Sequence, residues 1–120
     1  MRKLRITWHQ TTTAYDRLGH DSAEIYCRAF AACLRDEYSE VDVQIVPSYR
    51  EHDADYEFEG ELDEGQPITG LAVDGRAEVS CAVPLGDWDE RELDCIRQAL
   101  NRAQSWAWVR AERMAETWYD

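Results

Sequence analysis

The sequence contains few basic residues and a single lysine. Among its 120 residues are 25 Asp and Glu but only 13 Lys and Arg, so the formal net charge is −12. Proteins that bind DNA or RNA directly depend on lysine and arginine for most of their affinity. The composition therefore argues against direct binding to a nucleic acid.

Long apolar runs are also absent. No run approaches the roughly 18 residues of a membrane-spanning helix, and the N-terminal segment MRKLRITWHQ lacks the apolar centre of a secretory signal. A chain of 120 residues with 44% hydrophobic residues can still bury a modest core. We therefore expect a single soluble domain over residues 1–120, located in the cytoplasm and not bound to a membrane.

Motifs for catalysis or for cofactors are missing. His9, His20 and His52 form no HxxxH, HxH or HExxH pattern, and the glycines lack the spacing of a phosphate-binding loop. The four cysteines contain no CxxC pair, which favours free, largely buried thiols. We predict a non-enzymatic protein with no catalytic residue, no cofactor and no metal site. A small enzyme ranks third, after the two binding functions described at the end of this section. His52, Asp53 and Asp55 could hold a metal ion only if ligands converged from other elements.

Hydrophobic periodicity predicts a strand-helix-strand unit in the first half of the chain. Alternation of apolar and polar residues indicates strands at residues 4–9 and 41–47, and helical spacing indicates a helix at residues 22–38. The segment 10–20, rich in Thr, Asp and Gly, is expected to form a loop. A unit of this length predicts a right-handed crossover between two parallel strands.

The middle of the chain is typical of a three-stranded antiparallel meander. The Asp-Gly dipeptide at 74–75 suits a tight hairpin turn, which sets Ala72 opposite Ala77. A second turn at 63–65, with glycine last, sets Tyr56 opposite Ala72. The two turns, interpreted independently, place apolar side chains on one common face, and this agreement supports the register.

Residues 87–120 contain no Gly or Pro and predict a long C-terminal helix. Eight of its residues fall within roughly an 80° stripe that indicates a packed face: Leu93, Ile96, Leu100, Ala103, Ala107, Ala111, Met114 and Trp118. Such a helix is longer than a domain of this size is wide, so we expect a bend near 101–105 or a projecting end. The fold class is α+β: a strand-helix-strand unit, the meander and the long helix, with the helices on one face of the sheet.

The most unusual feature is an alternation of acidic residues between positions 51 and 63. We call these residues the acidic run: Glu51, Asp53, Asp55, Glu57, Glu59, Glu61 and Asp63. On a strand this alternation sends every carboxylate to one face, with neighbours about 6.6 Å apart. A second acidic patch, which includes Asp87, Asp89 and Glu90, begins the C-terminal helix, where the helix dipole favours negative charge.

Several interpretations of the acidic run stay open. One is a solvated sheet face that serves solubility, as in a protein from a halophilic source, and another is a surface that imitates the repeated charge of a nucleic-acid backbone. Cation binding is a third, although a strand spaces its carboxylates too widely to wrap one ion and no DxDxDG loop is present. All twelve excess negative charges lie in residues 51–120, which favours a local role over general solubility.

The C-terminal helix also carries apolar residues outside its stripe. These are Trp106, Trp108 and Val109, which are interleaved with arginines. Either loops and the first helix cover them, or they form a contact surface for a partner or for a second copy of the chain, since interfaces are enriched in Trp and Arg.

In size and composition the chain resembles the small acidic inhibitors of phages and mobile elements, such as anti-CRISPR and anti-restriction proteins that imitate DNA. The resemblance implies a protein that blocks a basic nucleic-acid-binding site on another protein. The residues themselves nominate the surface that would bind this partner: Asp53, Asp55, Glu57, Glu59, Glu61, Asp63, Asp87, Asp89 and Glu90. The alternative is an oligomeric structural or adaptor module, a homodimer through the C-terminal helix, whose acidity serves solubility.

Overall fold

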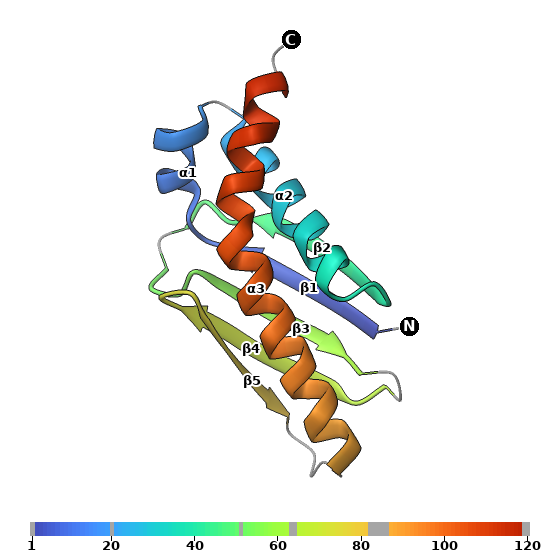
Figure 1. The fold of residues 1–120 in the computed structure, drawn as a ribbon. Coiled ribbons are helices and arrows are strands. Elements are labelled where there is room, and N and C mark those ends of the chain that lie inside the picture. Colours follow the sequence, from blue (N-terminus) through green and yellow to red (C-terminus); the bar gives the residue numbers. More distant parts are fainter. Residues whose placement is uncertain (1, 20, 51, 63–64, 82–86, 119–120) are drawn as a thin grey trace.

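The computed structural model has an α+β fold in which helices lie on one face of a five-stranded sheet (Figure 1). It describes residues 2–19, 21–50, 52–62, 65–81 and 87–118, without the side chains of residues 11–13, 17 and 87–89. The strands are β1 (Arg2–Trp8), β2 (Val41–Pro47), β3 (Tyr56–Glu61), β4 (Pro67–Val73) and β5 (Arg76–Cys81). The helices are α1 (Thr11–Leu18), α2 (Ser22–Glu37) and α3 (Asp87–Trp118).

The strand order is β2-β1-β3-β4-β5, which contains the predicted parallel unit and the predicted meander and joins them through β1 and β3. β1 and β2 are parallel, and α2 connects them across the sheet, whereas every other neighbouring pair is antiparallel. Alternate residues of each strand point toward the helices, and because these residues are mostly apolar, the inner face of the sheet is apolar. Leu4, Ile6 and Trp8 of β1 are all almost completely buried there.

The register of the meander is also confirmed. Ala72 pairs with Ala77 across the β4–β5 hairpin and with Tyr56 on β3. Asp74 and Gly75 have φ angles of 52° and 80°, which are the left-handed conformations that a two-residue hairpin turn needs. In the other turn, Gly65 has a φ of 86°, while residues 63 and 64 lie outside the described part.

The segment 10–20, which we expected to be a loop, contains α1, and this expectation was wrong. Ala14 and Leu18 are buried one helical turn apart, so packing stabilises a segment whose threonines have low helix propensity. The helix ends at Gly19, whose backbone N–H donates to Tyr15 O and whose φ is 91°. Tertiary packing, and not local helix propensity, therefore stabilises α1.

The long helix α3 is a single element, and its predicted stripe faces the core. Ala103, Ala107 and Ala111 are fully buried, and Figure 1 shows α3 crossing the sheet and then running beside α2. Its end does not project freely, because Trp118 Nε1 donates to Asp21 Oδ2 over 3.1 Å at the start of α2. Among the described helices, none is both long and apolar enough to cross a membrane.

Candidate functional site

The acidic run is a strand only in its second half. Its strand members occupy alternate positions and are exposed on the outer face of the sheet, the face that no described helix covers: Glu57, Glu59 and Glu61. The chain bends at residues 53–55, with Asp53 exposed on the bend. Glu51 and Asp63 lie outside the described residues. The expectation of one extended strand carrying the whole run is therefore corrected.

Asp55 is the clearest correction within the run. Alternation predicted an exposed carboxylate, but Asp55 is only 8% exposed. Its side-chain oxygens accept hydrogen bonds from Gln10 Nε2 at 2.5 Å, from the Gly75 backbone N–H at 2.8 Å and from Gln104 Nε2 at 3.0 Å. Because the chain bends before β3 begins, this carboxylate turns inward and joins the end of β1, the hairpin turn and α3.

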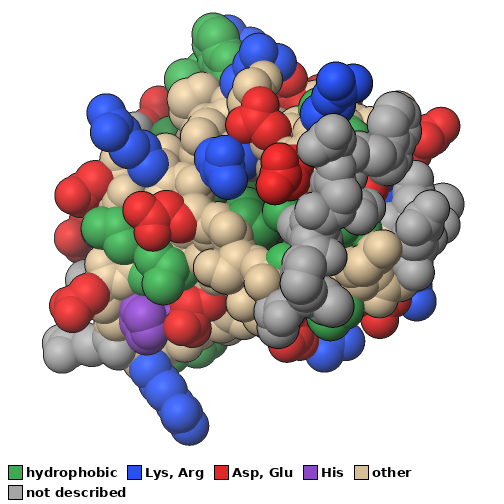
Figure 2. Space-filling view, turned by 90° about the horizontal axis from the view of Figure 1, so that it is seen from below, with side chains coloured by type: hydrophobic (Ala, Val, Ile, Leu, Met, Phe, Trp, Pro, Cys, Tyr) green, Lys and Arg blue, Asp and Glu red, His purple; other side chains and the backbone are tan. Residues whose placement is uncertain are grey.

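The glutamates of β3 lie opposite basic residues of β1. Strand pairing sets Glu59 opposite Arg5 and Glu61 opposite Lys3, and Arg5 Nη1 lies 3.8 Å from Glu59 Oε1. Lys3 and Arg5 lie far from the acidic run along the chain, so only the strand pairing shows that they oppose it. The side of the molecule drawn in Figure 2 likewise shows acidic and basic side chains interspersed. The outer face of β1 and β3 and the side drawn in Figure 2 are therefore mixed in charge.

The second acidic patch is only partly described. Glu90 is exposed near the start of α3, whereas the side chains of Asp87 and Asp89 lie outside the described part. Two residues beyond Glu90, Glu92 is 6% exposed and forms an ion pair with Arg2 of β1. This acid holds α3 to the sheet and is not available to a partner.

The apolar residues outside the stripe of α3 separate into two environments. Trp106 is 62% exposed and Val109 is 41% exposed, as a contact surface requires. Trp108 was expected in the same surface, but its ring packs 4.4 Å from the ring of Tyr26 and 6.3 Å from that of Trp8, measured between centroids. Two residues along a helix correspond to a turn of about 200°, so Trp108 faces the core and its assignment to the contact surface is corrected.

Trp106 and Val109 border a groove of about 560 Å³ between α2 and α3. Cys33 and Met114 contribute further apolar lining. Ion pairs cross the groove between the two helices: Arg110 Nη1 lies 2.7 Å from Asp36 Oδ2, and Arg102 Nη1 lies 3.7 Å from Glu37 Oε2. The hydrogen bond to Asp36 raises the pKa of Arg110. The groove is thus apolar at its centre and charged at its edges.

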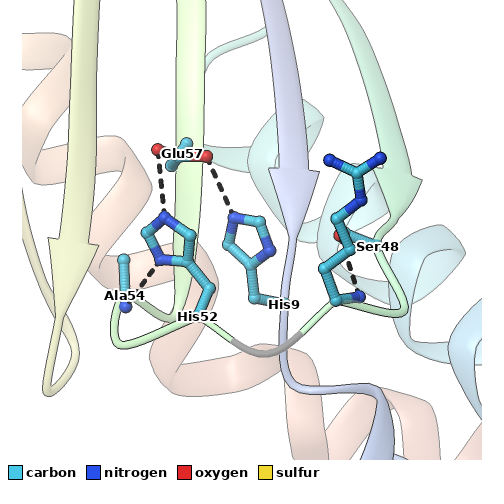
Figure 3. A network of polar contacts seen from close by, with 6 residues as sticks. His9, Ser48, His52, Ala54 and Glu57 are labelled. Carbon is cyan, nitrogen blue, oxygen red and sulfur yellow. Dashed lines mark hydrogen bonds and ion pairs between the residues drawn. The ribbon is translucent and has the colours of Figure 1, made fainter.

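A histidine-carboxylate cluster that no sequence motif predicted lies where β1 ends (Figure 3). It brings His52 together with His9 and Glu57, and not with Asp53 and Asp55. His9 follows β1, His52 lies in the β2–β3 connection, and Glu57 belongs to β3. Glu57 Oε2 is 3.1 Å from His9 Nε2, and Glu57 Oε1 is 3.3 Å from His52 Nε2. The imidazole rings stack with centroids 4.2 Å apart and an interplanar angle of 8°.

Strand pairing explains why no motif revealed this cluster. Thr7 pairs with Glu57 across β1 and β3, which brings His9 within reach of a residue 48 positions away in the sequence. The bend at residues 53–55 then turns His52 back over the same strand end, where the Ala54 backbone N–H donates to His52 Nδ1 over 3.0 Å. No short spacing pattern encodes such an arrangement.

All four cysteines are free thiols. Cys27 and Cys33 are buried, Cys81 is half-buried and Cys95 is exposed. Burial raises the pKa of Cys27 to about 12 and also raises the pKa of Cys33. A thiol whose pKa is raised stays protonated at neutral pH and is a weak nucleophile.

Comparison with known proteins identifies no function for the chain. No protein-family model matches the chain, and no curated protein and no solved structure matches it significantly. Two features of the described surface remain as candidates for function, the groove at Trp106 and the cluster at Glu57.

Proposed function

We propose that the chain is a non-enzymatic binding protein whose α2–α3 groove engages a basic surface on another protein. Trp106 carries this proposal, because it is 62% exposed at the groove while the Ala103, Ala107 and Ala111 stripe beside it is fully buried. Tryptophan and arginine are enriched among the residues that contribute most of the binding free energy of protein interfaces. An exposed Trp with neighbouring Arg residues is therefore typical of a binding surface.

The charge of the chain supports a basic partner over a second copy. A net charge of −12 attracts a basic protein at long range and repels an identical chain. A homodimer through α3 would have to overcome this repulsion with the apolar lining of one groove, which consists mainly of Trp106, Val109, Cys33 and Met114. The oligomeric adaptor is therefore the second candidate, and it uses the same groove.

A narrower form of the proposal is that the basic surface is a nucleic-acid-binding site, which the chain occupies in place of DNA or RNA. The overall acidity and the exposed side chains of Glu57, Glu59 and Glu61 support this form. Arg5 and Lys3, which lie opposite two of these glutamates, weaken it. A cytoplasmic location belongs to the same proposal and is supported by the four free thiols.

A pair of matched variants tests the proposed groove. Trp106→Ser removes the exposed indole, and Tyr49→Ser is the control because Tyr49 is an exposed aromatic residue, 80% accessible, in the β2–β3 connection. We expect the parent and the Tyr49→Ser variant to capture the same basic protein from the source cell, and the Trp106→Ser variant to lose it. Equal capture by both variants, followed by equal affinity for the purified partner, would remove the groove from the proposal.

The same partner decides between the narrower form and the adaptor. If the purified partner binds an oligonucleotide, the chain should displace that oligonucleotide in a competition measurement, whereas a ternary complex would contradict imitation of a nucleic acid. Light scattering of the chain alone at micromolar concentration tests the second copy. A dimer that dissociates on the Trp106→Ser substitution would favour the adaptor.

A further inference from the structure

We infer that His9, His52 and Glu57 form a binding site for one divalent transition-metal ion, with Zn²⁺ as its representative. One donor atom from each residue lies within 4.8 Å of the others. The donors come from three separate places, the end of β1, the β2–β3 connection and β3 itself. This site is distinct from the groove at Trp106, and it does not depend on the proposed function.

The two stacked rings present their Nε2 atoms to the same carboxylate. His9 Nε2 and His52 Nε2 each face an oxygen of the same carboxylate, at 3.1 and 3.3 Å, and Figure 3 shows both rings turned toward Glu57. Zinc bonds of about 2.0–2.2 Å in a tetrahedron place its donors about 3.4 Å apart. The three donors therefore need to draw together by about 1 Å, and the stacked rings must turn so that their lone pairs converge on one ion. The partly exposed side chains of His52 and Glu57 leave room for this rotation.

The donor set selects the class of ion. Two imidazole nitrogens with one carboxylate oxygen suit zinc and similar transition metals, whereas calcium and magnesium prefer oxygen donors alone. Three protein ligands leave one tetrahedral position, which water or a side chain of a partner can fill.

His9 supplies its Nε2 from a nearly buried ring, whose side chain is 5% exposed. Its Nδ1 has no hydrogen-bond partner among the described residues. When Nε2 binds the ion, the ring proton lies on Nδ1, where water can accept it. The site therefore rests on the three converging side chains and not on this nitrogen.

The contact between Ala54 and His52 determines what must change when the ion binds. Because the Ala54 N–H donates to His52 Nδ1, the ring proton lies on Nε2 and points at Glu57. To bind a metal through Nε2, His52 takes the tautomer with its proton on Nδ1 and gives up the bond from Ala54. Metal binding is thus coupled to a small movement of residues 52–54, and His52 is partly accessible, with a 38% exposed side chain, so the fold permits that movement.

Calorimetric titration with Zn²⁺ tests the site in the 120-residue chain. The exposed Cys95 is first replaced by serine, because a free thiol also binds zinc. We expect one Zn²⁺ per chain, an affinity at least about 100-fold lower in His52→Ala and Glu57→Gln, since even a ligand's supporting partner is worth 10–100-fold, and unchanged affinity in Glu59→Gln, the control two residues along the same strand. Equal Zn²⁺ affinity in the parent and in His52→Ala, or Ca²⁺ competing at equal concentration, would overturn the site.

Nuclear magnetic resonance of the unmodified chain gives a second measurement that needs no substitution. On addition of one equivalent of Zn²⁺, the ring resonances of His9 and His52 and the amide resonance of Ala54 should shift together and reach their end point at the same ratio. Shifts confined to cysteine or to carboxylates elsewhere would contradict the inference.

Discussion

Asp55 and Glu59 belong to one acidic run, four residues apart, and the fold uses them in opposite ways. Asp55 is buried and accepts three hydrogen bonds from three different parts of the chain. Glu59 is exposed, with 66% of its side chain accessible, and faces an equally exposed Arg5. The comparison teaches that alternation identifies a shared face only where the chain is a strand. One bend converts a surface acid into a structural one.

Removal of the Asp55 carboxylate should produce the largest effect. In Asp55→Ala, the Gly75 N–H and the two glutamine amides lose a buried acceptor, and each buried group left unpaired costs about 1–3 kcal/mol. We expect a loss of about 3 kcal/mol in the free energy of unfolding, measured by urea denaturation at neutral pH. Asp55→Asn, which keeps one carbonyl acceptor, should lose less. A loss below about 1 kcal/mol in Asp55→Ala would show that water replaces the carboxylate.

Trp108 and Trp106 of α3 offer the same contrast between a packed and an exposed side chain, here with aromatic residues. Trp108→Ala removes a ring that packs on Tyr26 and Trp8, and for a half-buried ring we expect a loss of about 3 kcal/mol. Trp106→Ala removes a ring that is largely in water, so the change should stay within about 0.5 kcal/mol. Thermal and urea unfolding of both variants measure the difference. Similar losses would mean that Trp106 is held in the core and not offered to a partner.

Unfolding at alkaline pH tests whether Tyr26, Tyr56 and Cys27 are buried in their neutral forms. Burial raises the pKa of Tyr26 and of Tyr56 well above the ordinary value of about 10, and that of Cys27 to about 12. At alkaline pH the folded state therefore keeps protons that the unfolded chain releases. The contribution of these groups to the free energy of unfolding is complete below about pH 8 and declines as pH rises through 10 and beyond. Urea midpoints should be lower at pH 10.5 than at pH 8, and equal midpoints would contradict the burial.

Tyr56→Phe sharpens the pH measurement. The Tyr56 hydroxyl is buried without a hydrogen-bond partner among the described residues, so its removal should leave stability at pH 8 unchanged or slightly higher. The fall between pH 8 and pH 10.5 should become shallower, since one group with a raised pKa is gone. A slope identical to that of the parent would assign the alkaline loss to other groups.

Local patterns predicted most of the fold and little of the candidate sites. The Asp74-Gly75 turn and the alternation around it established the meander register, because turn chemistry and strand period act over a few residues. α1 escaped prediction because its stability comes from burying Ala14 and Leu18. The position of Asp55 and the meeting of His9 with His52 depend on a bend and on pairing between distant strands. No pattern within one segment records either.

The smallest expected effect belongs to the exposed half of the acidic run. Glu59→Gln removes one partner of an ion pair whose side chains are both about two-thirds exposed, with a 3.8 Å separation. Water and salt screen such pairs, and their contribution is about 0–1 kcal/mol. We expect the urea midpoint to change little at physiological salt, while partner affinity falls if β3 takes part in recognition. A loss as large as that of Asp55→Ala would mean that Glu59 and Arg5 act in the fold as Asp55 does, and the distinction between the two halves of the run would fail.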